Sequence, residues 1–529
     1  MYRISELRLE LDGTPDDLKR AAAKRLRVRP AAIRSLSLYR KSVDARRKDD
    51  VHFICTADVD CPSCRAPRDR KITDAQPYRY ILPPSKPLKE RPVVVGFGPA
   101  GIFAALLLAQ AGQRPVVLER GSRVDRRAHR IEEFRKTGNL DPECNVQFGE
   151  GGAGTFSDGK LNTGTKDPRI RKVLEEFSAA GAPEEILYLA KPHIGTDRLP
   201  GTIRNLREKI LALGGDILFD TRMTGLIVKD GRVAGVKFRT ADGAEESLET
   251  NHAVLAVGHS ARDTFEMLYK MGLSMEAKSF SVGARIEHPQ QLIDLAQYGP
   301  SAGRPALGAA DYKLAVHLKN GRGVYTFCMC PGGTVVAAAN ERERLVTNGM
   351  SVFARDGKNA NSALLVGVGP RDYGGDGPLA GVEFQRRLEE AAFRLGGGDY
   401  RAPAQRVGDF LARRPSPCFG SVEPTYPRGA IPCSLDECLP PFLADSMREG
   451  ILEMEKHLRG FSLPDAVLTA VESRSSSPLR LLRGEDMQSV STGGLYPCGE
   501  GAGYAGGIVS AAVDGIRCAE KILEFSRLS

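Results

Sequence analysis

Tryptophan is absent from the 529 residues, and aromatic residues together make up only 6%. This absence disfavours classes of protein whose signature motif contains tryptophan. Long apolar runs are also missing, because the longest one beside a glycine motif, residues 102–112, is about half the ~20 residues that cross a bilayer. We therefore expect a buried helix there and no membrane span. Charge begins at Arg3, so the first residues lack the apolar core of a secretory signal, and we expect a cytoplasmic protein.

The chain has few closely spaced cysteines. Its 11 cysteines include one CxxC pair, Cys61 and Cys64, and one CxC pair, Cys328 and Cys330. A thiolate-bound metal or an iron–sulfur cluster needs about four such ligands close together, and these two pairs lie far apart in different predicted domains. We predict no metal site. The scattered cysteines are typical of reduced thiols in a cytosolic protein.

Positive charge is concentrated in the first 90 residues. This segment has 21 Lys and Arg against 13 Asp and Glu, which accounts for most of the net charge of +9. Its pattern predicts a strand over 2–10, a helix capped by Thr14, the strands SLSLYRK and VHFICTADV, and the proline-rich connector YRYILPPSKPLKER. We predict a small basic α+β module over 1–90. Its charge is typical of a solvated surface, while docking to nucleic acid, an acidic protein or an anionic ligand is the alternative.

A dinucleotide-binding unit follows the connector. The segment PVVVGFGPAGIFAALLLAQAGQRPVVLERG predicts a buried strand, a glycine turn, a helix and a second buried strand. Gly96 permits the tight turn, Gly98 lets the backbone approach a pyrophosphate, and Gly101 allows close packing of the helix on the strand. Pro99 and Ala100 begin the helix, whose N-terminus would receive the phosphates.

The second strand of this unit ends in an acidic residue. Glu119 is placed to accept hydrogen bonds from the hydroxyls of an adenosine ribose. Arg120 follows it directly, and Arg127 lies further along, either in contact with the cofactor or exposed on a helix. This acidic residue at the strand end supports dinucleotide binding but does not separate FAD from NAD.

Two glycine-rich loops and one strand favour FAD. The loop GEGGAGTFSDGK can line an extended ligand with backbone amides, and its candidate contacts are Gly152, Gly154, Thr155, Ser157, Asp158, Gly159 and Lys160. An apolar strand, AVLAVG, ends at Gly258. The loop YPCGEGAG and the following helix start could hold the ribityl chain and the N1 edge of a flavin, through Gly499, Glu500, Gly507 and Ile508.

These segments predict a discontinuous Rossmann-type domain. The cofactor domain covers 91–275 and 471–529, because strand, glycine loop and helix return near the C-terminus. Residues 276–470 are rich in strand-like runs such as YKLAVHL and GVYTFCMC and form the predicted β-rich substrate or cap domain. The predicted fold class is α/β, with an inserted α+β domain and the small module at the N-terminus.

The chain resembles a bacterial family of largely uncharacterised FAD-dependent dehydrogenases within the glutathione-reductase-like flavoprotein superfamily. The segments that carry the resemblance are NVQFGEGGAGTFSDGKLNT, KPHIGTDRL, VGHSARDTFEML, YTFCMCPGG, LAGVEFQRRLEE, ESRSSSPLRL and GLYPCGEGAGYAGGI. They cover about residues 90–525. The resemblance, which extends distantly to geranylgeranyl reductases and amine-oxidase-like proteins, implies FAD and a two-domain flavoprotein core but no substrate.

No second complete glycine fingerprint is present for NAD(P)H. In ALLVGVGPRDYGG, Asp372 stands where the third glycine belongs and Pro370 interrupts the turn, so we predict a strand of the substrate domain there. NAD(P)H is then expected only as a transient electron donor. Cys61 and Cys64 precede the cofactor domain, whereas disulfide reductases of this superfamily carry their redox pair inside it, so we do not expect an active dithiol.

The sequence gives three candidate catalytic residues. His259 follows Gly258 and could donate a proton or orient a group beside the cofactor, although a structural histidine is the alternative. Lys160 and Arg474 could hold an anionic substrate or the flavin N1 edge, with phosphate contacts or surface positions as alternatives.

We therefore expect an FAD-dependent oxidoreductase that moves a hydride or two electrons between FAD and a small organic substrate, with a redox partner as a further candidate contact. Flavin halogenases are disfavoured because their motif contains tryptophan, and the CGE of the C-terminal loop departs from the Gly-Asp pair of aromatic hydroxylases. Two alternatives stay open: a flavoprotein that acts on RNA through its basic module, as in tRNA modification, and a non-catalytic flavin-binding protein.

Overall fold

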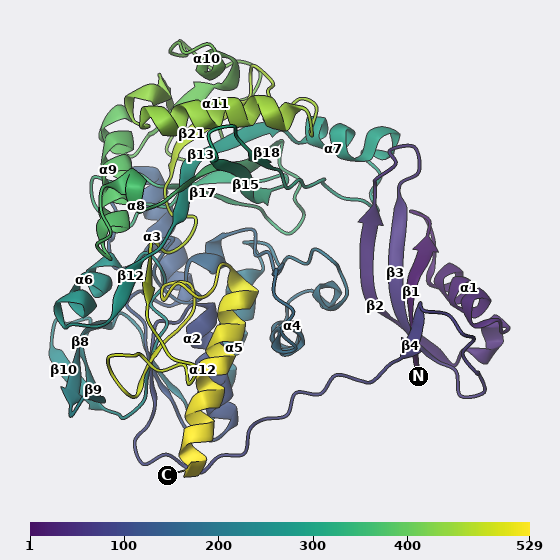
Figure 1. Cartoon of the computed structure of the whole chain (residues 1–529), viewed down its shortest axis with the longest axis horizontal. Helices are drawn as coiled ribbons and strands as arrows, with labels where there is room; N and C mark the ends of the chain where they lie inside the picture. Colours follow the sequence, from purple (N-terminus) through teal and green to yellow (C-terminus); the bar gives the residue numbers. More distant parts are fainter. Residues whose placement is uncertain (529) are drawn as a thin grey trace.

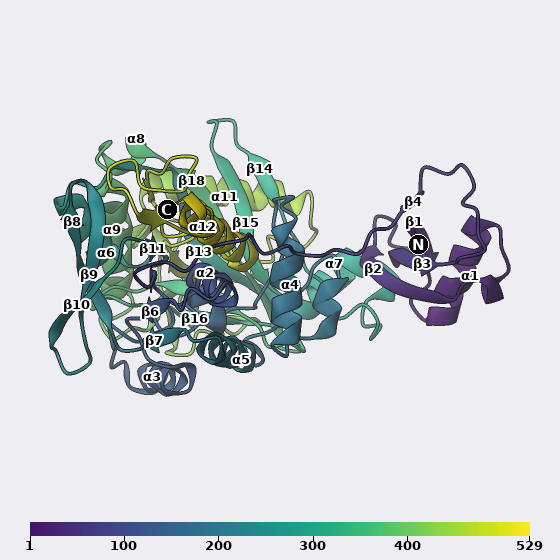
Figure 2. The same ribbon diagram turned by 90° about the horizontal axis from the view of Figure 1, so that it is seen from below.

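The computed structural model describes residues 1–528, without the side chain of Leu528. Three bodies of structure make up the chain: an N-terminal module, a cofactor domain built on a parallel sheet, and a domain built on a seven-stranded sheet that is inserted between two parts of the cofactor domain. In both overall views the module stands at one end of the molecule, and an extended connector joins it to the rest (Figures 1 and 2). No described helix is both long and apolar enough to cross a membrane.

The N-terminal module is a four-stranded sheet with one helix. Its strands, in the order β2-β3-β1-β4, are β2 (Ser35–Asp44), β3 (His52–Asp60), β1 (Tyr2–Leu9) and β4 (Ile72–Asp74), and its helix is α1 (Pro15–Leu26). Thr14 and Asp17 form the capping box of α1, as the sequence predicts. The module contacts the rest of the chain through β2, where Lys41 exchanges backbone hydrogen bonds with Tyr188 and Ala190.

A disulfide joins Cys61 and Cys64 just after β3. The expectation of reduced thiols is therefore wrong for this pair. A turn closed by a hydrogen bond from the Cys64 N–H to the Cys61 carbonyl sets the two Cα atoms 5.4 Å apart, inside the range that a disulfide requires.

The cofactor domain has a five-stranded parallel sheet between two apolar cores. Its strands, in spatial order, are β23 (Leu495–Pro497), β11 (Ala253–Leu255), β5 (Val93–Val95), β6 (Val116–Leu118) and β7 (Asp216–Leu218). Successive side chains point to opposite faces, so Val94 packs against helices while Val93 and Val95 face an antiparallel sheet. The helices on the first face are α2 (Pro99–Gln110), α4 (Arg169–Ala179), α5 (Leu199–Ala212) and α12 (Ile508–Leu528). The sheet on the second face comprises β8 (Arg222–Lys229), β9 (Arg232–Arg239) and β10 (Glu245–Glu249).

Two more helices belong to this domain, α3 (Val124–Thr137) and α6 (Arg262–Lys270). The C-terminal strand and helix complete the domain, because β23 pairs with β11 and α12 packs on α2. The predicted α/β fold with a Rossmann-type cofactor domain is thus confirmed.

The third body is built on a mixed seven-stranded sheet. Its strands, in spatial order, are β14 (Ala315–His317), β15 (Gly323–Cys330), β18 (Asn359–Val368), β13 (Phe280–Pro289), β21 (Val467–Glu472), β19 (Ala402–Arg406) and β20 (Ala430–Pro432). Two small pairs flank it, β12 (Met275–Ala277) with β22 (Leu479–Leu481) and β16 (Thr334–Ala337) with β17 (Thr347–Met350). Its helices are α7 (Gln290–Tyr298), α8 (Pro370–Tyr373), α9 (Ala380–Leu395), α10 (Val407–Leu411) and α11 (Pro441–Glu455).

The two faces of this sheet differ in polarity. Val282, Ala284 and Ile286 of β13 lie in the apolar core that also contains the buried face of α11. Arg285 and Glu287 alternate with them and are fully buried on the opposite face. Buried charges of this kind need partners, and those partners define the second half of the site described next.

Candidate functional site

The glycine turn has the geometry that its spacing predicts. Gly96 adopts a left-handed φ of 97°, and α2 begins at Pro99 with no side chain capping its N-terminus. A Cβ on Gly101 would lie 1.9 Å from the Gly96 carbonyl oxygen, so only glycine lets this helix pack on the turn. A Cβ on Gly98 would meet only the Gly152 Cα, at 3.6 Å. The uncapped N–H groups are therefore free to receive a pyrophosphate.

Glu119 ties the turn to the loop 149–160. One carboxylate oxygen accepts from the Phe97 N–H at 2.8 Å, and the other accepts from the N–H groups of Gly121 and Gly149, each at 2.9 Å. Two carboxylate oxygens offer about four acceptor sites, so acceptor capacity remains for a ribose hydroxyl. Glu119 thus both organises the glycine-rich backbone and stays available to a ligand.

Arg127 holds the backbone of the same loop through hydrogen bonds. It is fully buried, and its guanidinium donates to the carbonyls of Asn145, Val146, Gly149 and Glu150. Burial lowers the pKa of Arg127 to about 10. The alternative that Arg127 is exposed on a helix is therefore wrong, because Arg127 is buried and holds the backbone of the loop in place. Arg120 is also engaged, with its guanidinium paired to Glu143 and Asp263.

Three glycine-rich segments converge at one place. Gly152 lies against Gly98, and an added Cβ on Gly154 would come within 3.1 Å of Ile508 at the start of α12. Thr155 is buried against the Glu150 carbonyl, and the Ser157 hydroxyl donates to the Gly154 carbonyl. We call the segments 96–101, 149–157 and 498–508, together with Glu119, the cofactor cradle.

The C-terminal part of the cradle borders open space. An added Cβ on Gly258, Gly506 or Gly507 would meet no atom within 4 Å, and Gly507 has a φ of 129° just before α12. The Glu500 carboxylate lies 3.3 Å from His259 Nδ1, so the structure brings these two predicted site residues together. A cradle of bare glycines around a helix N-terminus, with an acidic residue at either end, fits an extended dinucleotide such as FAD.

A cavity of about 500 Å³ lies beside the backbone of Glu119. It is lined by Arg123, Phe219 and Asp220 among others, after the ends of β6 and β7, and Thr221 in its wall donates to the Glu119 carbonyl. Sequence reasoning missed these residues. Their signal is their position, because ligands of parallel sheets bind at the carboxyl ends of adjacent strands.

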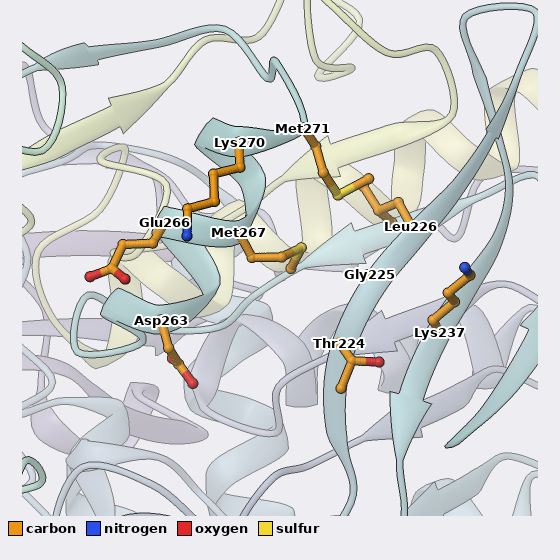
Figure 3. Close-up of a pocket in the computed structure, with 9 residues that line it drawn as sticks. All are labelled: Thr224, Gly225, Leu226, Lys237, Asp263, Glu266, Met267, Lys270 and Met271. Atoms are coloured by element: carbon orange, nitrogen blue, oxygen red, sulfur yellow. The ribbon is translucent and has the colours of Figure 1, made fainter.

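A second cavity of similar size lies away from the cradle. It has a volume of about 510 Å³ between α6 and the strands β8 and β9, with Lys237, Met267 and Lys270 in its wall (Figure 3). The Asp263 carboxylate at its edge is already paired with Arg120. None of the predicted site residues lines this cavity.

The loop that forms the cradle continues into a group of charged side chains. The buried Asp158 accepts from Arg355 at 3.1 Å and 2.5 Å, and its carboxylate lies 3.1 Å from Lys160 Nζ. Although burial opposes it, Lys160 and Arg355 hold the pKa of Asp158 below its usual range. Lys160 also donates to the Met329 carbonyl on β15, so the cofactor loop contacts the seven-stranded sheet directly.

The polar face of that sheet supplies the remaining charges. Arg285 is fully buried, pairs with Glu472 at 3.1 Å, and donates to the Asn361 side chain and the Cys328 carbonyl. Burial raises the pKa of Glu472 to about 7, against the effect of Arg285. The Asn361 Nδ2 is buried without a partner among the described residues. We call Asp158, Lys160, Arg285, Arg355, Asn361 and Glu472 the polar cluster; of these, the sequence analysis found only Asp158 and Lys160.

Arg474 takes a different place from the one expected. It is buried, and its guanidinium donates to the Glu389 carboxylate at 2.8 Å and 3.0 Å and also to Asn340. Arg262 donates to the same carboxylate at 2.7 Å and 2.9 Å. Because this network already occupies the guanidinium, we do not carry Arg474 forward as a substrate ligand.

One group of side chains has the spacing of a metal site. The ligand atoms of Cys498, Asp514 and Cys518 lie within 4.8 Å of one another. Asp514 also forms an ion pair with Arg483 at 2.7 Å and accepts from the Gly499 N–H. A guanidinium that already neutralises the carboxylate does not fit a cation site, and the role visible here is to hold the cradle loop at Gly499.

Comparisons with known proteins agree with this geometry. Residues 279–475 match the family model described as FAD-dependent protein, C-terminal domain-like, and residues 1–60 match a domain of unknown function. A protein of Clostridium beijerinckii, described as uncharacterized, is 48% identical over 529 residues, which cover 99% of this chain and 98% of that protein.

Solved structures resemble the chain only distantly. The flavin-dependent brominase Bmp2 matches with 13% identity and a TM-score of 0.38, over 83% of this chain and 80% of its own. A 3-ketosteroid dehydrogenase from Rhodococcus jostii matches with 13% identity and a TM-score of 0.35, over 83% of this chain and 96% of its own. We draw nothing about the activity from likenesses at this level.

The full-length relative and the matching domain model settle the family. The chain belongs to the same family as the clostridial protein, and its match to the FAD-dependent protein domain identifies FAD as its cofactor.

Proposed function

We propose that this protein moves a hydride or two electrons between FAD in the cofactor cradle and a small anionic organic substrate held beside the polar cluster. One observation carries the proposal: a single loop belongs to both parts. Gly152 and Gly154 pack on the cradle, while Asp158 and Lys160 of the same loop pair with groups of the seven-stranded sheet. A substrate bound by the loop's second half is thereby held close to a cofactor bound by its first half.

Bound FAD supplies the two-electron chemistry, and the protein supplies position and charge. The N-terminus of α12 would stabilise negative charge at the flavin N1 edge. Lys160, Arg285 and Arg355 make the cluster cationic, which favours a substrate carrying a carboxylate or a polarised carbonyl. Glu472, whose pKa burial raises to about 7, can hold or release a proton near neutral pH.

The segment that resembles a second glycine fingerprint bears on the choice of electron donor. The segment that most nearly repeats the glycine fingerprint forms strand β18 of the seven-stranded sheet, and Pro370 begins the short helix α8 behind it. A resident NAD(P)H domain is therefore not part of the proposal. We propose that NAD(P)H, if it is the donor, binds transiently at the substrate position.

The test is anaerobic flavin bleaching. Purified holoprotein is mixed with NADH, NADPH and a panel of small carboxylates and carbonyl compounds, and the flavin absorbance near 450 nm is followed. We expect at least one donor to bleach the flavin and an acceptor from the panel to restore it. Bound flavin that dithionite bleaches, but that no donor of the panel bleaches, would contradict the proposal.

A further inference from the structure

Strand β15 ends in a β-bulge that carries two cysteines. The register between β15 and β18 shifts between Phe327 and Cys330, and Cys328 adopts a left-handed φ of 43°. A cysteine in this conformation is strained, and such strain is maintained only where surrounding contacts fix it. The contacts that fix it here come from the polar cluster.

The bulge brings the Cys330 thiol close to the backbone of Cys328. On a straight strand, residues two apart point to the same face with Cα atoms about 6.6 Å apart, near the upper limit for a disulfide. A bulge bends the strand and shortens that span. The Cys330 thiol donates to the Cys328 carbonyl at 3.2 Å, so its sulfur lies against the Cys328 backbone.

The environment separates the roles of the two sulfurs. The Cys330 side chain, together with Lys160 and Arg285, lowers the pKa of the Cys328 thiol, although burial and Asp158 oppose this. The Cys328 side chain and burial raise the pKa of Cys330. Arg285 donates to the Cys330 Sγ, and Glu472, the partner of Arg285, adds a further charge beside Cys328. Cys328 is half-buried while Cys330 is fully buried, so a reagent reaches Cys328 first.

We propose that Cys328 and Cys330 form a second redox centre, a thiol pair that closes reversibly to a disulfide by exchange with a small disulfide. The Cys328 thiolate attacks one sulfur of R–S–S–R, the S–S bond breaks, and RS⁻ leaves. The Cys330 thiol then loses its proton to solvent and attacks the Cys328 Sγ, which expels the second RS⁻. The protein dithiol is oxidised by two electrons and R–S–S–R is reduced to two RSH.

Closure of the pair would act on the proposed substrate position. The disulfide removes the thiolate that Lys160 and Arg285 face, so both cations gain freedom to bind an anion. Thiol oxidation is thus expected to change the affinity of the polar cluster for substrate. This inference goes beyond the proposed function and does not depend on it, because exchange requires no flavin turnover.

The test uses holoprotein with Cys418 replaced by Ser, since Cys418 is the only exposed free cysteine among the described residues. The protein is equilibrated in glutathione/glutathione disulfide buffers and quenched with N-ethylmaleimide. After digestion, mass spectrometry measures the mass of the peptide that contains Cys328 and Cys330. We expect the oxidising buffers to yield a peptide two hydrogens lighter that carries no maleimide, and reducing buffers to restore two maleimides. C330S should instead trap glutathione on Cys328, and C328S should trap none.

Lys160→Gln tests the activating charge. Because the thiolate is the nucleophile, this variant should slow maleimide addition to Cys328 at pH 6.5 by about tenfold. Flavin content and thermal unfolding verify that each variant is folded. A pair that stays doubly labelled at every glutathione ratio in the folded protein, with no mixed disulfide in C330S, would overturn the proposal. Because the readout is peptide mass, this result is distinguishable from a failure of flavin reduction.

Discussion

In the cofactor cradle, the groups offered to a ligand are backbone amides on three short segments. In the polar cluster, they are side chains that come from a loop, three different strands and the segment after β17. The cradle tolerates no side chain where its helix packs on the glycine turn, because an added Cβ on Gly101 would lie 1.9 Å from the Gly96 carbonyl oxygen. The cluster consists of one amide and five ionisable groups held in ion pairs, and Asp158, Arg285 and Glu472 among them are buried. Local glycine spacing specifies the cofactor cradle, whereas the polar cluster forms only when strands that are distant in sequence pair.

This contrast explains what the sequence could predict. Gly96, Gly98, Gly101 and Glu119 were identifiable because their spacing is fixed within one βαβ unit. The parallel sheet and the return of the chain at β23 and α12 were predictable for the same reason. Asn361 and Glu472 were not, because β18 also carries Asn359 and Ser362 and β21 also carries Thr469, so nothing local singles them out. Only the pairing of β18 and β21 with β13 places both beside Arg285.

The role of Arg474 was missed for a related reason. Its partner Glu389 lies on α9, far away in sequence, and nothing local in ESRSSSPLRL indicates a buried ion pair. The N-terminal module shows the opposite case, because alternation and the Thr14 cap predicted its strands and helix before any contact was known.

The largest expected effect is on the buried network that joins α6 to α9 and to Arg474 after β21. Glu389→Gln leaves the buried Arg262 and Arg474 with Glu341 as their one remaining carboxylate partner, so the free energy of unfolding should fall by about 3 kcal/mol. Denaturant unfolding measures it. Although burial opposes it, the two arginines hold the pKa of Glu389 far below its usual range. The stabilisation that the Glu389 carboxylate gives the folded state is therefore fully present above the unfolded pKa of about 4.3, and it is lost as the pH falls further below that value. A difference between wild type and variant that does not shrink below pH 4 would contradict this.

Two glycine substitutions in the cradle should have different effects on stability and on FAD binding. Gly101→Ala forces the helix off the turn and should cost about 3 kcal/mol of stability together with FAD binding. Gly98→Ala meets the protein only at ordinary contact distance, so its stability should change by less than about 1 kcal/mol while FAD affinity falls at least about tenfold. Thermal unfolding of apoprotein and flavin titration separate the two effects. Equal losses of stability in both variants would show that Gly98 serves packing and not the pyrophosphate.

Glu472→Gln should have the smallest effect and act on the cluster alone. Burial raises the pKa of Glu472 to about 7, so the side chain is protonated below that pH and charged above it. We expect the rate of flavin reduction by the substrate to bend near pH 7 in the wild type and to lose that bend in the variant. Flavin content should be unchanged. A bend that persists in the variant would assign the titration to another group.

The central claim is that the loop 149–160 couples cofactor and substrate, with its glycines in the cradle and Lys160 in the polar cluster. Rapid mixing of anaerobic wild-type and Lys160→Gln holoprotein with the best donor, followed at the flavin absorbance, tests it most directly. We predict the same flavin content and the same bleaching by dithionite in both proteins, but reduction by the donor at least about 100-fold slower in the variant. Equal rates of reduction by the donor would contradict the claim.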